Sequence, residues 1–377
     1  MLPHNWRVFK PAAVILSGAL LFLAGCATAP VDNSEPPPPD WVATNAVVRP
    51  PVNHPVARLP VNVKTNLPPV LRTNPAPVKL VRAAPILTWT SLNRWAAEQK
   101  LAPPRKLANS PVTAYAISSP NGTMTLEIGS RDVTWNGLTL HFGFAPEIID
   151  DQVFIYGLDL QKNLEPLLLG GPLAFGSNRL VVIDPGHGGI NVGTHSVLDG
   201  RFEREFTLDW ARRLKPLLET NGWRVLLTRT NDVDVSLSNR VAFAEARRAD
   251  LFISLHFNSA APDKKQAGLE TYCLTPTGMP STLTRNYADL WSESFANNAY
   301  DTENLQLAIR LQRALLLASG EEDRGVRRAR FMGVLHGQHR PAVLIEGGYL
   351  SNPHEAERIA TGAFRQKLAE AIACALK

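Results

Sequence analysis

Four residues of the chain have side chains suited to metal-assisted hydrolysis, and three of them stand at the end of an apolar segment. His187, His256 and Glu346 each follow a run that reads as a buried strand, while Glu203 lies between the two histidines in the sequence. Two imidazoles and one carboxylate form a common zinc site with one open position, and a further carboxylate can move protons during hydrolysis. The pattern predicts that His187, Glu203 and His256 bind one zinc ion and that Glu346 is the catalytic base.

Two glutamates are available as the third metal ligand. Glu203 lies just before an expected helix, so its side chain can project back toward the strand ends. Glu205 falls in the first turn of that helix, where the helix dipole favours a carboxylate whether or not a metal is present. We choose Glu203 and keep Glu205 as the alternative. Each histidine taken alone is also explained by an ordinary structural role, so the prediction depends on the two histidines together.

These residues must be positioned by alternating strands and helices, which the chain shows from Asn178 onward. Apolar strands bounded by amphipathic helices predict an α/β fold with a mostly parallel sheet and helices on both faces. In such sheets ligands bind at the carboxyl ends of the strands. The expected strands cover residues 180–183, 224–228, 251–255, 269–274 and 342–345, and the expected helices cover residues 207–218, 237–248 and 302–317, followed by a closing helix.

The four residues also lie in motifs that resemble one known family. These motifs are Asp-Pro-Gly-His-Gly-Gly around His187, Glu-Arg-Glu-Phe-Thr-Leu from Glu203, Ser-Leu-His-Phe-Asn around His256, and Pro-Ala-Val-Leu-Ile-Glu ending at Glu346. In order and spacing they resemble the zinc-dependent N-acetylmuramoyl-L-alanine amidases of the type-3 amidase family. The resemblance covers residues 178–377, which we take as the catalytic domain, and it favours Glu203 over Glu205.

The resemblance implies hydrolysis of the amide bond between the lactyl group of N-acetylmuramic acid and L-alanine in peptidoglycan. A zinc peptidase acting on the stem peptide is an alternative, because the same metal chemistry cleaves any amide. A wall-binding or activator protein without catalytic activity is a second alternative, although the intact set of four residues argues against it. The family also allows a protein activator as a partner.

Several residues depart from the family pattern or have no fixed role in it. Asn191 stands where aspartate is common, and His336 and His339 precede the last strand as candidate substrate contacts. Glu270 is a candidate for orienting the metal ligands without binding the metal itself. Residues 280–301 occupy a region that varies within the family, and in some members it carries a helix that blocks the site. We expect this segment to form a wall of the substrate groove, with a regulatory lid as the alternative.

The amino terminus indicates an exported and anchored protein. Residues 1–26 combine two basic residues, a short apolar run and small residues before Cys26, which is the pattern of a secretory signal. The segment resembles a bacterial lipoprotein signal, which implies cleavage before Cys26, lipid on its thiol, and a periplasmic protein anchored to the outer membrane in preference to the inner one. Residues 27–85 contain 14 of the 30 prolines and predict an extended linker.

A second, smaller globular region precedes the catalytic domain. Residues 86–170 show one short helical pattern and several short strands, which predicts a small α+β module. Its sequence resembles the module named after the amino-terminal domain of copper amine oxidases, and no catalytic pattern is visible in it. The net charge of +5 is dispersed along the chain, so we expect no nucleic-acid partner.

Overall fold

The computed structural model describes residues 88–108, 113–284 and 289–377. The predicted signal segment with its lipidation site at Cys26 and the proline-rich linker therefore lie outside the described residues. Within the described ranges, no helix combines the length and the apolar character that crossing a membrane requires.

The region from residue 88 to residue 168 contains short strands and helices. A sheet of five strands has the order β2-β3-β4-β5-β6, and a sheet of three strands has the order β1-β8-β7. Every pairing in these two sheets is antiparallel. The elements are β1 (Trp89–Ser91), α1 (Leu92–Glu98), β2 (Arg105–Ala108), β3 (Ala114–Ser119), β4 (Gly122–Glu127), β5 (Asp132–Trp135), β6 (Leu138–His141), β7 (Glu147–Ile149), β8 (Gln152–Tyr156), α2 (Gly157–Asp159), η1 (Leu160–Leu164) and α3 (Glu165–Leu168).

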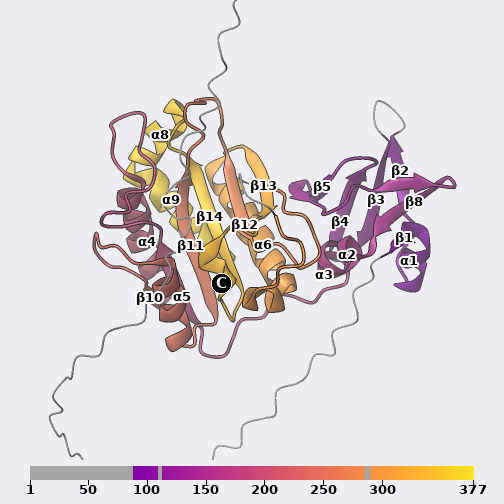
Figure 1. Ribbon diagram of the computed structural model, residues 1–377, viewed down its shortest axis with the longest axis horizontal. Helices are drawn as coiled ribbons and strands as arrows, with labels where there is room; N and C mark the ends of the chain where they lie inside the picture. Colours follow the sequence, from indigo (N-terminus) through magenta and orange to yellow (C-terminus); the bar gives the residue numbers. More distant parts are fainter. Residues whose placement is uncertain (1–87, 109–112, 285–288) are drawn as a thin grey trace, which may run out of the picture. The chain divides into compact units, whose positions relative to one another are not determined.

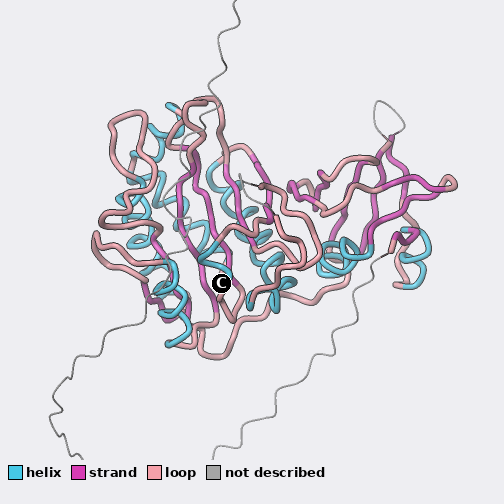
Figure 2. The backbone as a smooth tube through the Cα atoms, in the orientation of Figure 1, coloured by secondary structure: helices cyan, strands magenta, loops and turns pink. Residues whose placement is uncertain are grey.

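The following region contains a sheet of six strands in the order β10-β9-β11-β14-β12-β13. Its central strands run side by side in Figure 1, and Figure 2 separates them from the surrounding helices by colour. The strands are β9 (Leu180–Pro185), β10 (Arg224–Leu227), β11 (Leu251–Asn258), β12 (Leu269–Cys273), β13 (Asp323–Arg328) and β14 (Ala342–Tyr349). The helices are α4 (Glu203–Thr220), α5 (Leu237–Ala246), η2 (Ala296–Tyr300), α6 (Asp301–Ser319), α7 (Gly333–His336), α8 (Pro353–Ala360) and α9 (Gly362–Ala375).

The two faces of this sheet have separate coverings, because side chains alternate along each strand. On one face Val181, Ile253 and Val343 belong to a core that also contains buried residues of α4, α6 and α9. On the other face Val182 and Phe252 belong to a second core with buried residues of α5 and α7. The prediction of an α/β sheet with helices on both faces is confirmed by this arrangement.

The sheet differs from the prediction in the direction of two strands. β9, β10, β11 and β14 are mutually parallel, but β12 pairs with β14 in the antiparallel direction and β13 continues parallel to β12. The sheet is therefore mixed. Two smaller differences are that the closing helix is divided into α8 and α9, and that Glu203 is the first residue of α4 instead of preceding it.

Candidate metal centre

Two imidazoles and one carboxylate from three distant segments meet beside the carboxyl ends of β9 and β11. His187 Nε2 lies 3.0 Å from Glu203 Oε2, and His256 Nδ1 lies 2.9 Å from Glu203 Oε1. One ligand atom from each of the three residues lies within 4.8 Å of the other two, so together they could hold a metal ion. The structure thus brings together the three residues that the sequence suggested as metal ligands.

Glu203 is buried, yet its surroundings keep it ionised. Burial alone would raise the pKa of the Glu203 carboxyl, but the charges and hydrogen bonds of His187 and His256 hold this pKa well below its usual range. The backbone N–H groups of Phe257 and Thr194 donate further hydrogen bonds of 3.0 and 3.1 Å to the carboxylate. Position 203 also begins α4, where the helix dipole stabilises a negative charge. A buried carboxylate that stays ionised is ready to bind a cation.

The turn after β9 presents His187 in a fixed orientation. The ring Nδ1 lies 2.7 Å from Asn191 Oδ1, which leaves Nε2 directed at Glu203. An acceptor on the second ring nitrogen fixes the orientation of a histidine that binds metal. Two glycines make room for the rings: a Cβ atom at Gly186 would lie 2.3 Å from His256 Cε1, and one at Gly193 would lie 2.7 Å from His187 Cδ2. Side chains at these two positions would push the imidazoles apart.

Glu346 reaches the same place through the register of the sheet. It pairs with His256 across the parallel strands β11 and β14, so the two side chains stand on the same face of the sheet. On its other side it pairs with Glu270 of β12. Glu270 is itself engaged by Arg324 and by the hydroxyl of Tyr349, which lies 2.8 Å away. Glu346 is therefore beside the three clustered residues without being one of them.

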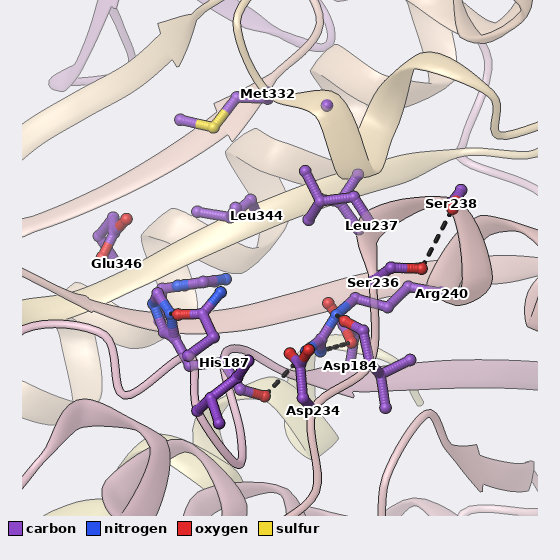
Figure 3. A pocket seen from close by; sticks show the side chains of 16 residues that line it. Asp184, His187, Asp234, Ser236, Leu237, Ser238, Arg240, Met332, Leu344 and Glu346 are labelled. Atoms are coloured by element: carbon purple, nitrogen blue, oxygen red, sulfur yellow. Dashed lines mark hydrogen bonds and ion pairs between the residues drawn. The ribbon is translucent and has the colours of Figure 1, made fainter. Parts of the chain in front are cut away.

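A cavity of about 480 Å³ opens onto these groups. It lies on the sheet face covered by α5 and α7, and Figure 3 shows His187, Leu344 and Glu346 around it. The lining combines both histidines and Glu346 with apolar residues such as Leu237, Met332 and Leu344. The lining residues are Asp184, His187, Ile190, Asn191, Asp234, Val235, Ser236, Leu237, Ser238, Arg240, His256, Met332, Gly333, Val334, Leu344 and Glu346. A substrate in this cavity can reach the histidines and Glu346 together.

Comparison with known proteins identifies the family. Residues 181–377 match the Amidase_3 family, described as N-acetylmuramoyl-L-alanine amidase. This match covers more than half of the chain and contains His187, Glu203, His256 and Glu346. The chain belongs to this amidase family.

Individual relatives agree with the family match. The chain is 32% identical over 222 residues to the N-acetylmuramoyl-L-alanine amidase AmiA of Salmonella typhimurium, a match that covers 52% of this chain and 75% of that protein. It is 33% identical over 239 residues to the amidase AmiC of Neisseria meningitidis, covering 57% of this chain and 55% of that protein. Among solved structures, the amidase AmiC2 of Nostoc punctiforme is 31% identical and has a TM-score of 0.43, with 54% of this chain and 97% of that chain covered.

Other candidate residues of this amidase lie away from the cavity. Glu205 accepts a hydrogen bond of 3.2 Å from the backbone N–H of Phe202 and so caps the amino-terminal end of α4. His336 stacks on Phe295 with ring centroids 3.8 Å apart, and His339 lies 3.3 Å from Glu245 with a largely exposed side chain. None of the three candidates lines the cavity.

The described part of the variable segment lies outside the lining of this cavity. None of its described residues, 280–284 and 289–301, lines the cavity. Its described part instead holds Asp289, which pairs with Arg330, and Phe295, which stacks on His336. Residues 332–334, which the sequence did not single out, do line the cavity.

Proposed function

We propose that the chain hydrolyses the amide bond between the lactyl group of N-acetylmuramic acid and the L-alanine of the stem peptide, using one zinc ion held by His187, Glu203 and His256. The observation that carries this proposal is the convergence of these three side chains within 4.8 Å, at a cavity that also reaches Glu346. Membership of the amidase family supplies the substrate.

The donor set fits zinc in chemistry and in number. Two imidazole nitrogens and one carboxylate oxygen are a ligand set that catalytic zinc sites use, and such sites keep one position open for water or substrate. When bound, zinc acts as a Lewis acid on the scissile carbonyl and lowers the pKa of water. The hydrogen bond to Asn191 orients the His187 ring, and the low pKa of the Glu203 carboxyl keeps a negative charge available for a dication.

Glu346 is the residue assigned to proton transfer. As the general base it takes a proton from the attacking water, and it then delivers a proton to the leaving amine of L-alanine. Its place beside His256 on one face of the sheet puts the carboxylate next to the cluster. Leu344 lies two residues earlier on the same strand face and lines the cavity, so it gives the substrate an apolar surface next to the base.

The test combines metal analysis with product analysis on the purified full chain. We expect about one zinc ion per chain. A muropeptide digest should yield intact stem peptides and lactyl-ended glycans. A chelator should abolish this activity, and added zinc should restore it. Shortened stem peptides would identify a zinc peptidase instead. A zinc-loaded chain that binds cell walls and releases nothing would indicate a wall-binding protein, unless adding a protein activator starts hydrolysis.

We also propose a lipid anchor at Cys26 and a periplasmic location at the outer membrane. The support is the sequence of the signal segment and the proline-rich linker, which is long enough to separate the catalytic domain from a membrane. The region 86–170, which resembles the copper amine oxidase module, is proposed as a spacer or wall contact. Labelling with a radioactive fatty acid tests the anchor, because Cys26→Ser should lose the label and leave the membrane fraction.

A further inference from the structure

The backbone at His187 has a conformation that its surroundings must hold in place. His187 has φ of +61°, in the left-handed region that residues other than glycine rarely adopt. Such a conformation is unfavourable for a residue with a side chain and persists only where neighbouring groups fix it. Since His187 is a proposed metal ligand, whatever holds this turn also decides where its imidazole points.

Arg240 of α5 is the arginine that bonds the carbonyl of His187 itself, while the backbone pair Gly188–Asn191 closes the turn beyond it. Its Nη2 donates a 2.8 Å hydrogen bond to the carbonyl of His187, and its Nη1 donates one of 2.9 Å to the carbonyl of Pro185. Its Nε donates a 2.8 Å bond to the carbonyl of Val235, a residue of the cavity wall. One planar guanidinium thus joins the metal-ligand turn to the wall of the substrate cavity.

The guanidinium is itself fixed by a buried carboxylate. Arg240 Nη1 lies 2.5 Å from Asp184 Oδ1, and the exposed fractions of the two side chains are 3% and 1%. The hydroxyls of Thr228 and Ser254 donate to the same carboxylate. Burial would raise the pKa of the Asp184 carboxyl, but the charge of Arg240 and these hydrogen bonds keep it below its usual value. Figure 3 shows Asp184 and Arg240 side by side at the cavity.

We propose that Arg240 is a positioning residue of the metal centre, which fixes the backbone of His187 and ties it to the cavity wall at Val235. This inference rests on the proposed function, because it concerns a residue that orients a proposed zinc ligand. Arg229 supports the same turn from another side, through the carbonyls of Pro185 and Gly186, but no described contact joins it to His187. Arg240 alone of these two arginines lines the cavity.

The decisive variant is Arg240→Lys, because it separates charge from geometry. Lysine keeps a positive charge for Asp184 but presents a point charge, so it cannot reproduce the planar fork that reaches Asp184, His187 and Val235 together. Loss of an outer-shell partner typically lowers metal affinity by about 10–100-fold. We expect a loss of zinc affinity in this range, measured by competition with a chromophoric chelator. We also expect a higher KM, because Val235 in the cavity wall loses its hydrogen bond to Arg240.

A second variant keeps the test valid if the lysine variant fails to fold. Removing one partner of a buried ion pair leaves an uncompensated charge and is strongly destabilising, whereas removing both charges avoids that penalty. The double substitution Asp184→Asn with Arg240→Gln should therefore fold and should show the same loss of zinc affinity. Arg365→Lys is the matched control: Arg365 is a buried arginine that pairs with Asp209 at 2.5 Å, and it does not line the cavity.

The outcomes are distinguishable. A parent protein that binds no zinc would overturn the proposed function itself. A parent that binds zinc, together with Arg240 variants of unchanged zinc affinity, would overturn only the positioning role. An equal loss of affinity in the Arg365→Lys control would also overturn it, since the effect would then follow from general destabilisation.

Discussion

Replacing Glu346 by glutamine tests the division of labour between metal binding and proton transfer. Glutamine has nearly the same shape, so the side chain remains beside His256 on the sheet face and the cavity keeps its volume. The change removes the proton acceptor. A positioned general base contributes about 10²–10⁴-fold in rate, which corresponds to about 3–5 kcal/mol at about 1.4 kcal/mol for each factor of ten. We expect kcat to fall by about 10²–10⁴-fold.

The same substitution should leave zinc binding intact, because Glu346 is not one of the three residues whose ligand atoms cluster within 4.8 Å. The assay is the rate of peptide release from purified muropeptides, followed by mass spectrometry, with zinc occupancy measured on the same sample. A residual rate is expected, because substrate positioning and the metal site remain. An unchanged rate would refute the assignment of Glu346 as the base, and a loss of zinc would show that Glu346 is a fourth ligand.

Three further predictions concern residues around the site. Glu203→Gln should lose zinc affinity, because it removes the carboxylate of the clustered ligands. Glu205→Gln should keep zinc and lose only about 0.3–1 kcal/mol of unfolding free energy, because glutamine can still accept the Phe202 hydrogen bond but no longer places a negative charge at the start of α4. Chelator competition and chemical denaturation measure the two effects. The pKa of Asp184 is lowered in the folded protein, so its stabilising contribution is present above the unfolded pKa and is lost as the pH falls below about 4. The unfolding free energy should fall in that range more steeply for the parent than for the doubly neutral variant of Asp184 and Arg240. His339→Ala should leave kcat/KM on muropeptides unchanged, because its side chain is largely exposed and lies outside the cavity.

The convergence of the two histidines was predictable because it depends on the strands being parallel. His187 and His256 follow apolar strands, and parallel strands place their carboxyl ends at the same edge of a sheet. The same argument placed Glu346 correctly, because β14 is parallel to β11. Glu203 required more, since a helix start can direct either of two nearby glutamates inward. The structure separates them through helix geometry: residues two apart on a helix point to different sides, so when Glu203 faces the histidines, Glu205 cannot.

The parts that the sequence did not predict depend on tertiary packing. β13, at the edge of the sheet, was not predicted, because its sequence Asp-Arg-Gly-Val-Arg-Arg is charged and contains glycine. The reversed direction of β12 and β13 cannot be read from their apolar pattern, which is the same for either direction. Arg240 is a charged residue within a helix, which usually indicates a solvent-exposed face, and only its burial beside Asp184 shows otherwise. The hydrogen bond between His187 and Asn191 could have been expected from the sequence, because Asn191 lies four residues after His187 in the same glycine-rich turn.

The location of the site follows from how one face of the sheet changes along its strands. Val182 on β9, Phe252 on β11 and Ala342 on β14 are covered by α5 and α7 in the second core. Two residues further along, the same face presents Asp184 on β9 and Ser254 on β11, where the ion pair of Asp184 with Arg240 of α5 replaces apolar packing, while Leu344 on β14 remains in the second core.

Two residues further still, β11 and β14 present His256 and Glu346, and here the covering gives way to the cavity. On β9 and β11, the polar layer formed by Asp184 and Arg240 therefore lies between the apolar core and the reactive groups. Its bonds to the backbone of the metal-ligand turn explain how a rigid core can fix the direction of an imidazole at its edge. In this arrangement, weakening the polar layer should disturb metal binding before it disturbs the fold, which is the order of effects that the Arg240→Lys variant measures.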